Sequence, residues 1–420
     1  MDRLTAVERA LRAAAPYGLL DVVADALRQH YSAVDVQLRM ADYGVRSLQA
    51  VGADAGIAGE AVDAGAAGEA LAAAPAAEPV LIHDSPQGRA FGAADPVVVP
   101  DLASGTVTVH IAVSVRGDRV GVLSVTLPES ACEGELLPEL TYLSEALGHE
   151  IMVAERDTDL YLLARRASRL TLAAEMQWQL LPGRSCRRPE FALGAHLEPA
   201  YAIFGDNFDW SSSADHLTLT VTNGMGEGID AALLSNLAVN AVRNARRAGL
   251  GLADQAFLAD QAVFAQYRGA AYVSMLLMRF ALETGRVEVV EAGSPRVWRM
   301  REGKVEPLGF DAQLPLGMFE DTGFVAEYAD VRPGDRLLIA SDGVYDTSSK
   351  AGERYGEAAL VRSLAANRLL PAAQVPRAIL RELSEYRGVT PLDDDALVLC
   401  LDWYGREDGA GGAATRDGLP

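Results

Sequence analysis

The sequence is poor in the residues that bind transition metals or form disulfides. Its 420 residues include three cysteines and six histidines. Cys132, Cys186 and Cys400 lie far apart and never occur in a CxxC spacing, so neither a thiolate zinc site nor a disulfide framework is predicted. We therefore expect a reducing, cytoplasmic setting.

Positive charge and long apolar runs are also scarce. Asp and Glu outnumber Lys and Arg by 58 to 37, which gives a formal net charge of −21. Nucleic acid is therefore not an expected partner, because its binding needs a basic surface that displaces counterions from phosphates. No apolar run reaches the roughly 18 residues of a membrane span, and the N-terminus lacks the apolar core of a signal peptide. We expect a soluble protein that makes no membrane contact of its own.

The first part of the chain, residues 1–154, is predicted to fold as helix, sheet and helix. Helical spacing near the N-terminus gives way to strand-like alternation at residues 34–39 and 47–51. After an Ala/Gly-rich stretch at 53–77, two strands at 106–115 and 119–126 are joined by a turn at Arg116-Gly117-Asp118. A helix over 136–154 closes the segment.

A charged segment of residues 155–183 separates this part from the rest. Apolar residues from Leu163 to Leu181 recur at three- and four-residue intervals, until Pro182-Gly183 ends the pattern. The segment is either a short parallel coiled coil that joins two subunits or a single linker helix packed on its own chain.

The third part, residues 184–404, alternates strand patterns with two helical ones. The order predicts an α+β domain in which helices cover packed antiparallel sheets. Helices are expected at 230–248 and 253–265, and strands at 190–197, 217–222, 271–280, 286–292, 296–300, 323–328, 335–340 and 397–402. Residues 405–420 have little to bury, and we expect them to be disordered.

Aspartates concentrate where these strands begin or end. They occur in Gly205-Asp206-Asn207-Phe208-Asp209, in Ser341-Asp342-Gly343 and in Asp393-Asp394-Asp395. Carboxylate oxygens that converge at one sheet edge would select Mg²⁺ or Mn²⁺. The alternative is that the aspartates only cap turns and helices and bind nothing.

The N-terminal part resembles a GAF sensory domain. The resemblance rests on GDRVGVLSVTLPES followed by ELLPELTYLSEALGHEI, after a helix and a first pair of strands. It implies a small-molecule ligand, whose identity the residues do not indicate. The other interpretation is a packing or dimerisation domain without a ligand.

The third part resembles the SpoIIE-type branch of the PPM protein phosphatases, whose fold is an α/β/β/α sandwich. The motifs occur in order: GDNFDW, NGMGEG followed by a helix, EAGSP, PLGMFED, PGDRLLIASDGVYD and DDDALVLCLDW. The preceding AAEMQWQLLPGR resembles the linker of that branch. The resemblance covers about 220 residues and implies hydrolysis of phosphoserine or phosphothreonine by water activated between two Mn²⁺ or Mg²⁺ ions.

The resemblance assigns metal ligands and no catalytic residue beyond them. Asp206, Asp342 and Asp394 correspond to the family's metal-binding aspartates, with Asp393 as the alternative to Asp394. Gly224 corresponds to the glycine whose carbonyl contacts one metal. Asp209 is expected either to support the metal ligands without contacting the metal or to lie in a turn.

The main departure from the family is Asn223, which stands where the family has the aspartate that bridges the two metals. A neutral amide has one acceptor oxygen and cannot bridge two dications as a carboxylate does. The family's histidine in this motif is Glu227, and its N-A-G-H and D-D-x-T patterns here end in Ser294 and Leu397. We therefore expect fewer bound ions and weakened or lost activity, unless Glu227 supplies a replacement carboxylate or deamidation of Asn223-Gly224 recreates an aspartate.

Three functions fit these observations. The first is a sensor-regulated phosphatase, and the resemblance implies that its substrate is a phosphorylated anti-sigma-factor antagonist. The second is a pseudophosphatase that binds a phosphoprotein without hydrolysing it. The third is a pure ligand sensor with no phosphoprotein partner. We expect a cytoplasmic homodimer in the first two cases, with no nucleic acid involved.

Overall fold

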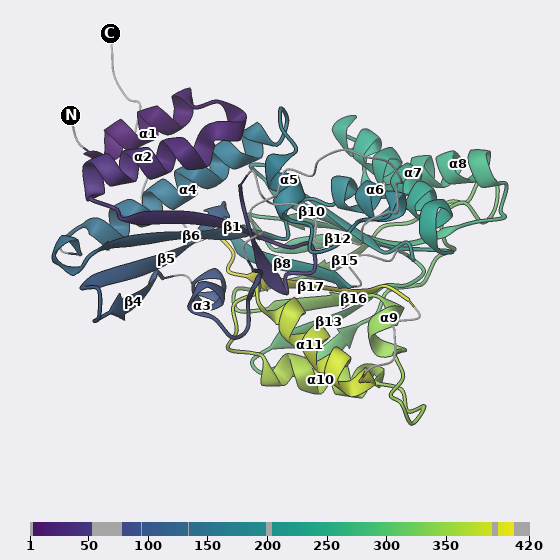
Figure 1. Cartoon of the computed structure of the whole chain (residues 1–420). Coiled ribbons are helices and arrows are strands. Elements are labelled where there is room, and N and C mark those ends of the chain that lie inside the picture. Colours follow the sequence, from purple (N-terminus) through teal and green to yellow (C-terminus); the bar gives the residue numbers. More distant parts are fainter. Residues whose placement is uncertain are drawn as a thin grey trace, which may run out of the picture. The chain divides into compact units, whose positions relative to one another are not determined.

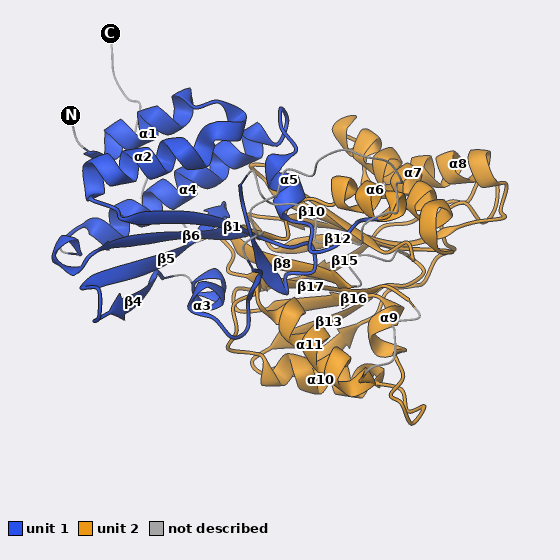
Figure 2. Ribbon diagram, viewed as in Figure 1, with its two compact units in different colours: residues 1–170 blue, residues 171–420 orange. Residues whose placement is uncertain are grey.

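The computed structural model describes residues 3–52, 78–93, 95–132, 134–198, 204–388 and 394–406. The Ala/Gly-rich stretch and almost all of the tail that we expected to be disordered lie outside these residues. The chain forms two compact units, residues 1–170 and 171–420 (Figure 2). No helix within the described ranges is both long and apolar enough to cross a membrane.

Unit 1 is an antiparallel sheet with helices on both of its faces (Figure 1). The strand order is β3-β2-β1-β6-β5-β4. Its strands are β1 (Asp35–Ala41), β2 (Ser47–Ala50), β3 (Val80–Leu81), β4 (Val97–Asp101), β5 (Thr106–Val115) and β6 (Asp118–Pro128). Its main helices are α1 (Arg3–Ala13), α2 (Leu19–Tyr31), α3 (Pro86–Gly92) and α4 (Leu136–Ala154).

The main core of unit 1 lies between the sheet and helices α1, α2 and α4. The apolar residues of α4 return every three or four positions, so Leu140, Leu143 and Leu147 form one fully buried stripe. They pack with alternate residues of β5, including Val109 and Ile111. The predicted order of helix, sheet and helix is confirmed for this unit.

The segment between the two parts is not one continuous helix. It forms α5 (Leu160–Ala164), in unit 1, and α6 (Leu172–Leu180), in unit 2. Thr171 begins α6 by accepting a hydrogen bond from the backbone N–H of Ala174, and this capping favours a fresh helix start over continuation. The expected 3-4 apolar repeat is therefore interrupted before it could form a long coiled-coil seam.

Unit 2 contains two antiparallel sheets. The first has the order β15-β12-β11-β10-β9 and the second the order β14-β13-β16-β17-β8-β7. The first comprises β9 (Asn207–Ser212), β10 (His216–Gly224), β11 (Val273–Ala281), β12 (Arg286–Ala292) and β15 (Glu327–Asp330). The second comprises β7 (Ser185–Arg187), β8 (Phe191–Glu198), β13 (Arg296–Arg301), β14 (Lys304–Leu308), β16 (Arg336–Ala340) and β17 (Ala396–Trp403).

Three apolar layers hold these sheets between helices. The central layer joins the two sheets through residues such as Leu219 and Leu399. Helices α7 (Gly228–Arg247) and α8 (Leu252–Tyr267) cover the first sheet. Helices α9 (Asp342–Tyr345), α10 (Gly356–Ala366) and α11 (Val375–Arg387) cover the second (Figure 1). Unit 2 thus has the helix, sheet, sheet, helix layering that the motif order implied.

Several elements of unit 2 were not predicted. No strand was predicted at β9, which includes part of the first aspartate motif and contributes Phe208 to the central core. Helices α10 and α11 were not predicted either. The buried face of α11 includes Ile379 and Leu383.

Candidate metal site

Acidic residues from both sheets of unit 2 meet at one edge. Asp206 lies just before β9, and Asn223 and Gly224 end the neighbouring strand β10. Asp342 begins α9 directly after β16, while Asp394 and Asp395 come just before the adjacent strand β17. We call Asp206, Asn223, Asp342, Asp394 and Asp395 the acidic edge.

Asp206 and Asp395 form the buried centre of the acidic edge. Asp206 is 1% exposed and Asp395 is completely buried. One carboxylate oxygen of Asp395 accepts the backbone N–H groups of Phe204 and Asp206 at 2.9 and 3.1 Å. This contact fixes the loop before β9 against the start of β17. Oδ2 of Asp206 and Oδ1 of Asp395 have no hydrogen-bond partner within the described parts of the chain.

Within the described parts of the chain, no cationic side chain neutralises these carboxylates. Burial, and then the charge of Asp395, raise the pKa of Asp206 well above its ordinary value. Burial raises the pKa of Asp394 to about 6. The pKa values of Asp342 and Asp395 are also raised, again chiefly by burial. Such a group of carboxylates is stabilised by a bound cation.

Asn223 occupies a central place at the acidic edge. Its amide nitrogen donates a hydrogen bond to Oδ1 of Asp342, which also accepts the backbone N–H of Gly343 at 3.0 Å. The residue therefore acts as a donor to a neighbouring ligand candidate. A carboxylate in its place would instead add a further negative charge.

The backbone around the site is closely packed. The N–H of Gly224 donates to the carbonyl of Gly205 at 3.2 Å, and the Ser235 hydroxyl of α7 donates to the same carbonyl at 2.6 Å. A Cβ atom on Gly205 would lie 2.7 Å from the Gly224 carbonyl oxygen. Only glycine permits this approach between the loop before β9 and the end of β10.

Three predicted site residues are not among the described contacts of the acidic edge. Asp209 lies within β9 and forms ion pairs with Arg243 and Arg246 of α7 at 2.7 and 2.9 Å. Glu227 is exposed at the N-cap of α7, and the contacts described above do not include it. Asp393 lies outside the described residues.

Three residues that shape the acidic edge were not predicted. Asp395 belongs to a predicted motif but was assigned no role, although its position directly before a mostly apolar strand indicates burial. Ser341 accepts the N–H of Leu397 at 3.0 Å and so joins the loops that carry Asp342 and Asp395. Gln177 of α6 donates to the Asp206 carbonyl at 2.7 Å, a contact that no local pattern could reveal.

The oxygen donors of the acidic edge suit a hard divalent cation, but they are not gathered around one metal position. Unpartnered, buried carboxylate oxygens are the ligands that Mg²⁺ and Mn²⁺ prefer. Among the described residues, however, no three His, Cys, Asp or Glu side chains converge closely enough to hold a metal ion. The chemistry of the edge therefore fits a metal, although the side chains are not gathered around one position in this structure.

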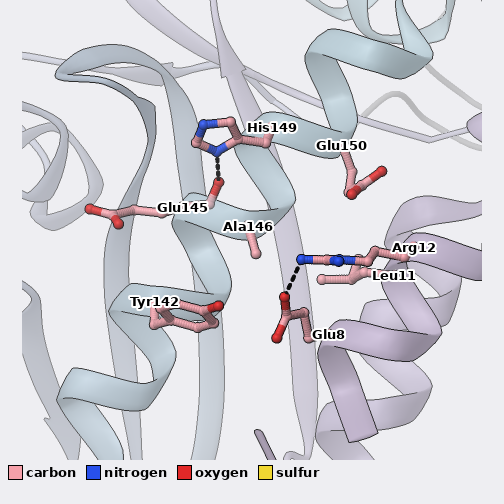
Figure 3. Close-up of a pocket in the computed structure, with 8 residues that line it drawn as sticks. All are labelled: Glu8, Leu11, Arg12, Tyr142, Glu145, Ala146, His149 and Glu150. Atoms are coloured by element: carbon pink, nitrogen blue, oxygen red, sulfur yellow. Dashed lines mark hydrogen bonds and ion pairs between the residues drawn. The ribbon is translucent and has the colours of Figure 1, made fainter. Parts of the chain in front are cut away.

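Unit 1 has a separate groove between α1 and α4 (Figure 3). Its volume is about 220 Å³. Arg12 pairs with Glu8 at 2.5 Å, and Nδ1 of His149 contacts the Glu145 carbonyl at 2.9 Å. Small-molecule sites are usually larger. This charged groove therefore does not identify a ligand for unit 1.

A comparison with protein-family models identifies the class of the C-terminal half. Two packed sheets between helices, with aspartates at one edge, are the arrangement that the motifs implied for a metal-dependent phosphatase. Residues 213–404 match the family model described as Stage II sporulation protein E (SpoIIE). The C-terminal half of the chain therefore contains a SpoIIE-type PP2C domain.

Several solved structures resemble about half of the chain. Structures of RsbU and RsbW domains from Mycobacterium tuberculosis and of the SpoIIE phosphatase domain with a regulatory fragment from Bacillus subtilis each match 52% of this chain. Their identities are 22% and 18% and their TM-scores 0.45 and 0.46. This chain spans 61% and 64% of their lengths.

A third solved structure, the SiaA PP2C domain from Pseudomonas aeruginosa, matches 55% of this chain and 94% of its own. Its identity is 21% and its TM-score 0.48. No curated protein matches the chain. The assignment to the SpoIIE type consequently rests on the family model.

Proposed function

We propose that unit 2 is a metal-dependent protein phosphatase domain for phosphoserine or phosphothreonine, and that Asn223 weakens or abolishes its activity. The observation that carries this proposal is the buried acidic edge, whose carboxylate oxygens at Asp206 and Asp395 lack partners among the described residues. Buried charges that are left unpaired cost stability unless a ligand compensates them. A divalent cation supplies that compensation.

Each residue of the acidic edge then has a distinct task. Asp206, Asp342 and Asp394, with the Gly224 carbonyl, would hold Mg²⁺ or Mn²⁺. When bound, such ions supply an activated water and polarise the phosphoryl oxygens. Asp395 keeps the loop of Asp206 in place through its two backbone contacts.

Asn223 limits how many ions this edge can hold. The amide cannot bridge two dications, and as observed it donates to Asp342 instead of offering its oxygen. We infer one bound ion or none at ordinary concentrations, where the family arrangement holds two. The exposed position of Glu227 gives no support to its role as a replacement ligand.

The same observation favours a second candidate, a pseudophosphatase that binds a phosphoprotein without turnover. In both cases the resemblance to SpoIIE-type proteins suggests a phosphorylated anti-sigma-factor antagonist as partner. The separate resemblance of unit 1 to a GAF domain suggests that this unit senses a small molecule and regulates unit 2. A protein that only senses a ligand would have no reason to keep the acidic edge.

Titration of Mn²⁺ into the full chain, with release of phosphate from a phosphopeptide followed in parallel, tests the proposal. We compare the natural chain with Asn223→Asp, and Asp206→Asn serves as the matched loss-of-charge control. Peptide mass spectrometry first establishes that Asn223 is not deamidated. We expect weak binding in the natural chain, and tighter binding with restored hydrolysis in Asn223→Asp.

The outcomes separate the two candidates. Hydrolysis by Asn223→Asp, but not by Asp206→Asn, supports a phosphatase whose activity this one position limits. Metal binding without hydrolysis in Asn223→Asp favours the pseudophosphatase. If neither protein binds Mn²⁺, the acidic edge is not a metal site and the proposal is wrong.

A further inference from the structure

A second polar cavity lies on unit 2, at the far end of the short helix that begins with Asp342. Its volume is about 320 Å³. Its lining combines two arginines, two acidic residues, a tyrosine and a glycine: Arg296, Tyr345, Asp346, Arg354, Gly356 and Glu357. We call it the arginine pocket. Neither the metal chemistry nor the proposed reaction uses these residues.

The Tyr345 ring gives the arginine pocket a fixed wall. The residue is 7% exposed, and its ring packs edge-on against Trp298 at 6.1 Å between centroids. Its hydroxyl lies 3.2 Å from the Ser294 hydroxyl. The Arg296 guanidinium lies 5.0 Å from the ring centroid, close enough for a cation–π contact that orients it.

The arginines retain hydrogen-bonding capacity for an anion. Arg296 pairs with Glu357, and Arg354 pairs with Asp346 at 3.1 Å. All four side chains are 45% to 72% exposed, so these ion pairs contribute little and exchange readily. A guanidinium carries about five N–H donors and no acceptor, whereas each of these ion pairs uses one donor. The pocket therefore offers a surplus of donors, which a carboxylate or phosphate would satisfy.

The distance from the acidic edge suits a peptide. Asp342 is the first residue of α9 and Tyr345 the last, so their separation along the helix axis is about 4.5 Å. An extended peptide advances about 3.3–3.6 Å per residue. A substrate whose phosphorylated residue lies at the acidic edge would therefore bring a residue one or two positions away to the arginine pocket.

We propose that the arginine pocket is a specificity subsite for an acidic group near the phosphorylated residue of the substrate. The group is a carboxylate or a second phosphate, and Arg296 and Arg354 recognise it. This inference rests on the proposed function, because it takes the acidic edge as the place where the phosphorylated residue binds. It adds a sequence preference that the metal chemistry does not provide.

Binding of fluorescent phosphopeptides to the full chain, measured by anisotropy in the presence of Mn²⁺, tests the subsite. The peptides carry one phosphoserine and either Glu, phosphoserine or Gln one or two residues away on either side. We expect the natural chain to bind a peptide with an acidic group about tenfold more tightly than the Gln peptide. In Arg296→Gln/Arg354→Gln this difference should disappear.

Two further variants distinguish loss of the subsite from damage to the fold. Arg286 also stacks on an exposed tyrosine, Tyr328, at 4.0 Å but lies outside the pocket lining, so Arg286→Gln should keep the preference. Glu357→Gln releases Arg296 from its ion pair and should tighten binding of the acidic peptides. Damage to the fold would not produce tighter binding.

The measurements distinguish failure of the subsite from failure of the proposed function. Acid-dependent binding without phosphate release would leave the subsite intact and reject the enzymatic form of the function. Phosphate release from all peptides at equal affinity, unaffected by the arginine substitutions, would reject the subsite alone. Equal losses for acidic and Gln peptides in the arginine variant would overturn the assignment, because the arginines would then contact the phosphorylated residue itself.

Discussion

Asp206 and Asp209 are three residues apart and almost equally buried, at 1% and 3% exposure, yet their surroundings are opposite. Asp209 points to α7, where Arg243 and Arg246 neutralise it at 2.7 and 2.9 Å. Asp206 faces other carboxylates, and burial together with the charge of Asp395 raises its pKa. Asp209 is therefore neutralised by two arginines, whereas Asp206 has no cationic partner among the described residues.

This difference distinguishes a buried charge that stabilises the fold from a buried charge that indicates a functional site. A buried acid that is paired within the chain keeps a helix on a sheet. A buried acid among other acids weakens the fold, and such perturbed groups concentrate at functional sites. The comparison therefore identifies the acidic edge as the functional candidate without reference to any relative. Four predictions test it, ordered from the largest expected effect to the smallest.

Removing the paired aspartate should damage unit 2 most. Asp209→Ala leaves Arg243 and Arg246 without their common partner, and we expect the free energy of unfolding to fall by about 3 kcal/mol. All four tryptophans lie in unit 2, so urea unfolding followed by tryptophan fluorescence reports on this unit. The exposed Glu283→Ala is the control and should change little. An equally small loss in Asp209→Ala would show that the pairs are not structurally important.

Removing the unpaired aspartate should have the opposite sign. In metal-free buffer at neutral pH, Asp206→Asn should raise the free energy of unfolding by about 1–3 kcal/mol, because a carboxyl with a raised pKa opposes folding when it is ionised in the unfolded chain. Added Mn²⁺ should narrow the difference by stabilising only the natural protein. A variant less stable than the natural chain without metal would contradict the comparison.

The contact between α6 and the acidic edge should affect metal affinity. Gln177→Leu removes the hydrogen bond to the Asp206 carbonyl, and we expect about tenfold weaker Mn²⁺ binding, as for other residues that orient metal ligands. The measurement is calorimetric, in the Asn223→Asp background. Gln179→Leu is the matched control, because Gln179 lies on the same helix and its side chain bonds to the exposed side of that helix at Glu175. Equal affinities in the two variants would rule out a positioning role for Gln177.

Glu291 should show the smallest effect, since it is only half-buried. Burial, and then the charge of Glu327, raise its pKa to about 7. Between about pH 4.5 and 7 the folded chain therefore binds more protons at this residue than the unfolded chain, so its contribution to stability falls as pH rises. Glu291→Gln should remove this dependence on pH. Because solvent screens the half-buried side chain, the free energy of unfolding should change by less than about 1 kcal/mol across this pH range. An unchanged slope in thermal unfolding at several pH values would refute it.

Periodicity predicted most strands of unit 2 because their alternation reflects burial on one face. It did not predict β9, whose sequence NFDWSS contains polar residues that are buried in the structure. Asn207 and Asp209 are buried there, under α7 in the case of Asp209. Local hydrophobicity cannot signal a strand whose buried face is polar. The strand is nevertheless required, since it places Asp206 at the sheet edge.

The amino-acid sequence by itself determined the order of helices and strands and the positions at which aspartates meet strand ends. It also identified Asn223 as a departure from the family pattern, because the chemistry of an amide side chain does not depend on the fold. Only the tertiary structure decided which aspartates are compensated. Asp206, Asp209 and Asp395 look alike in sequence, and their different roles come from partners 29 to 191 residues away. Charge compensation depends on distance in space, which local sequence does not encode.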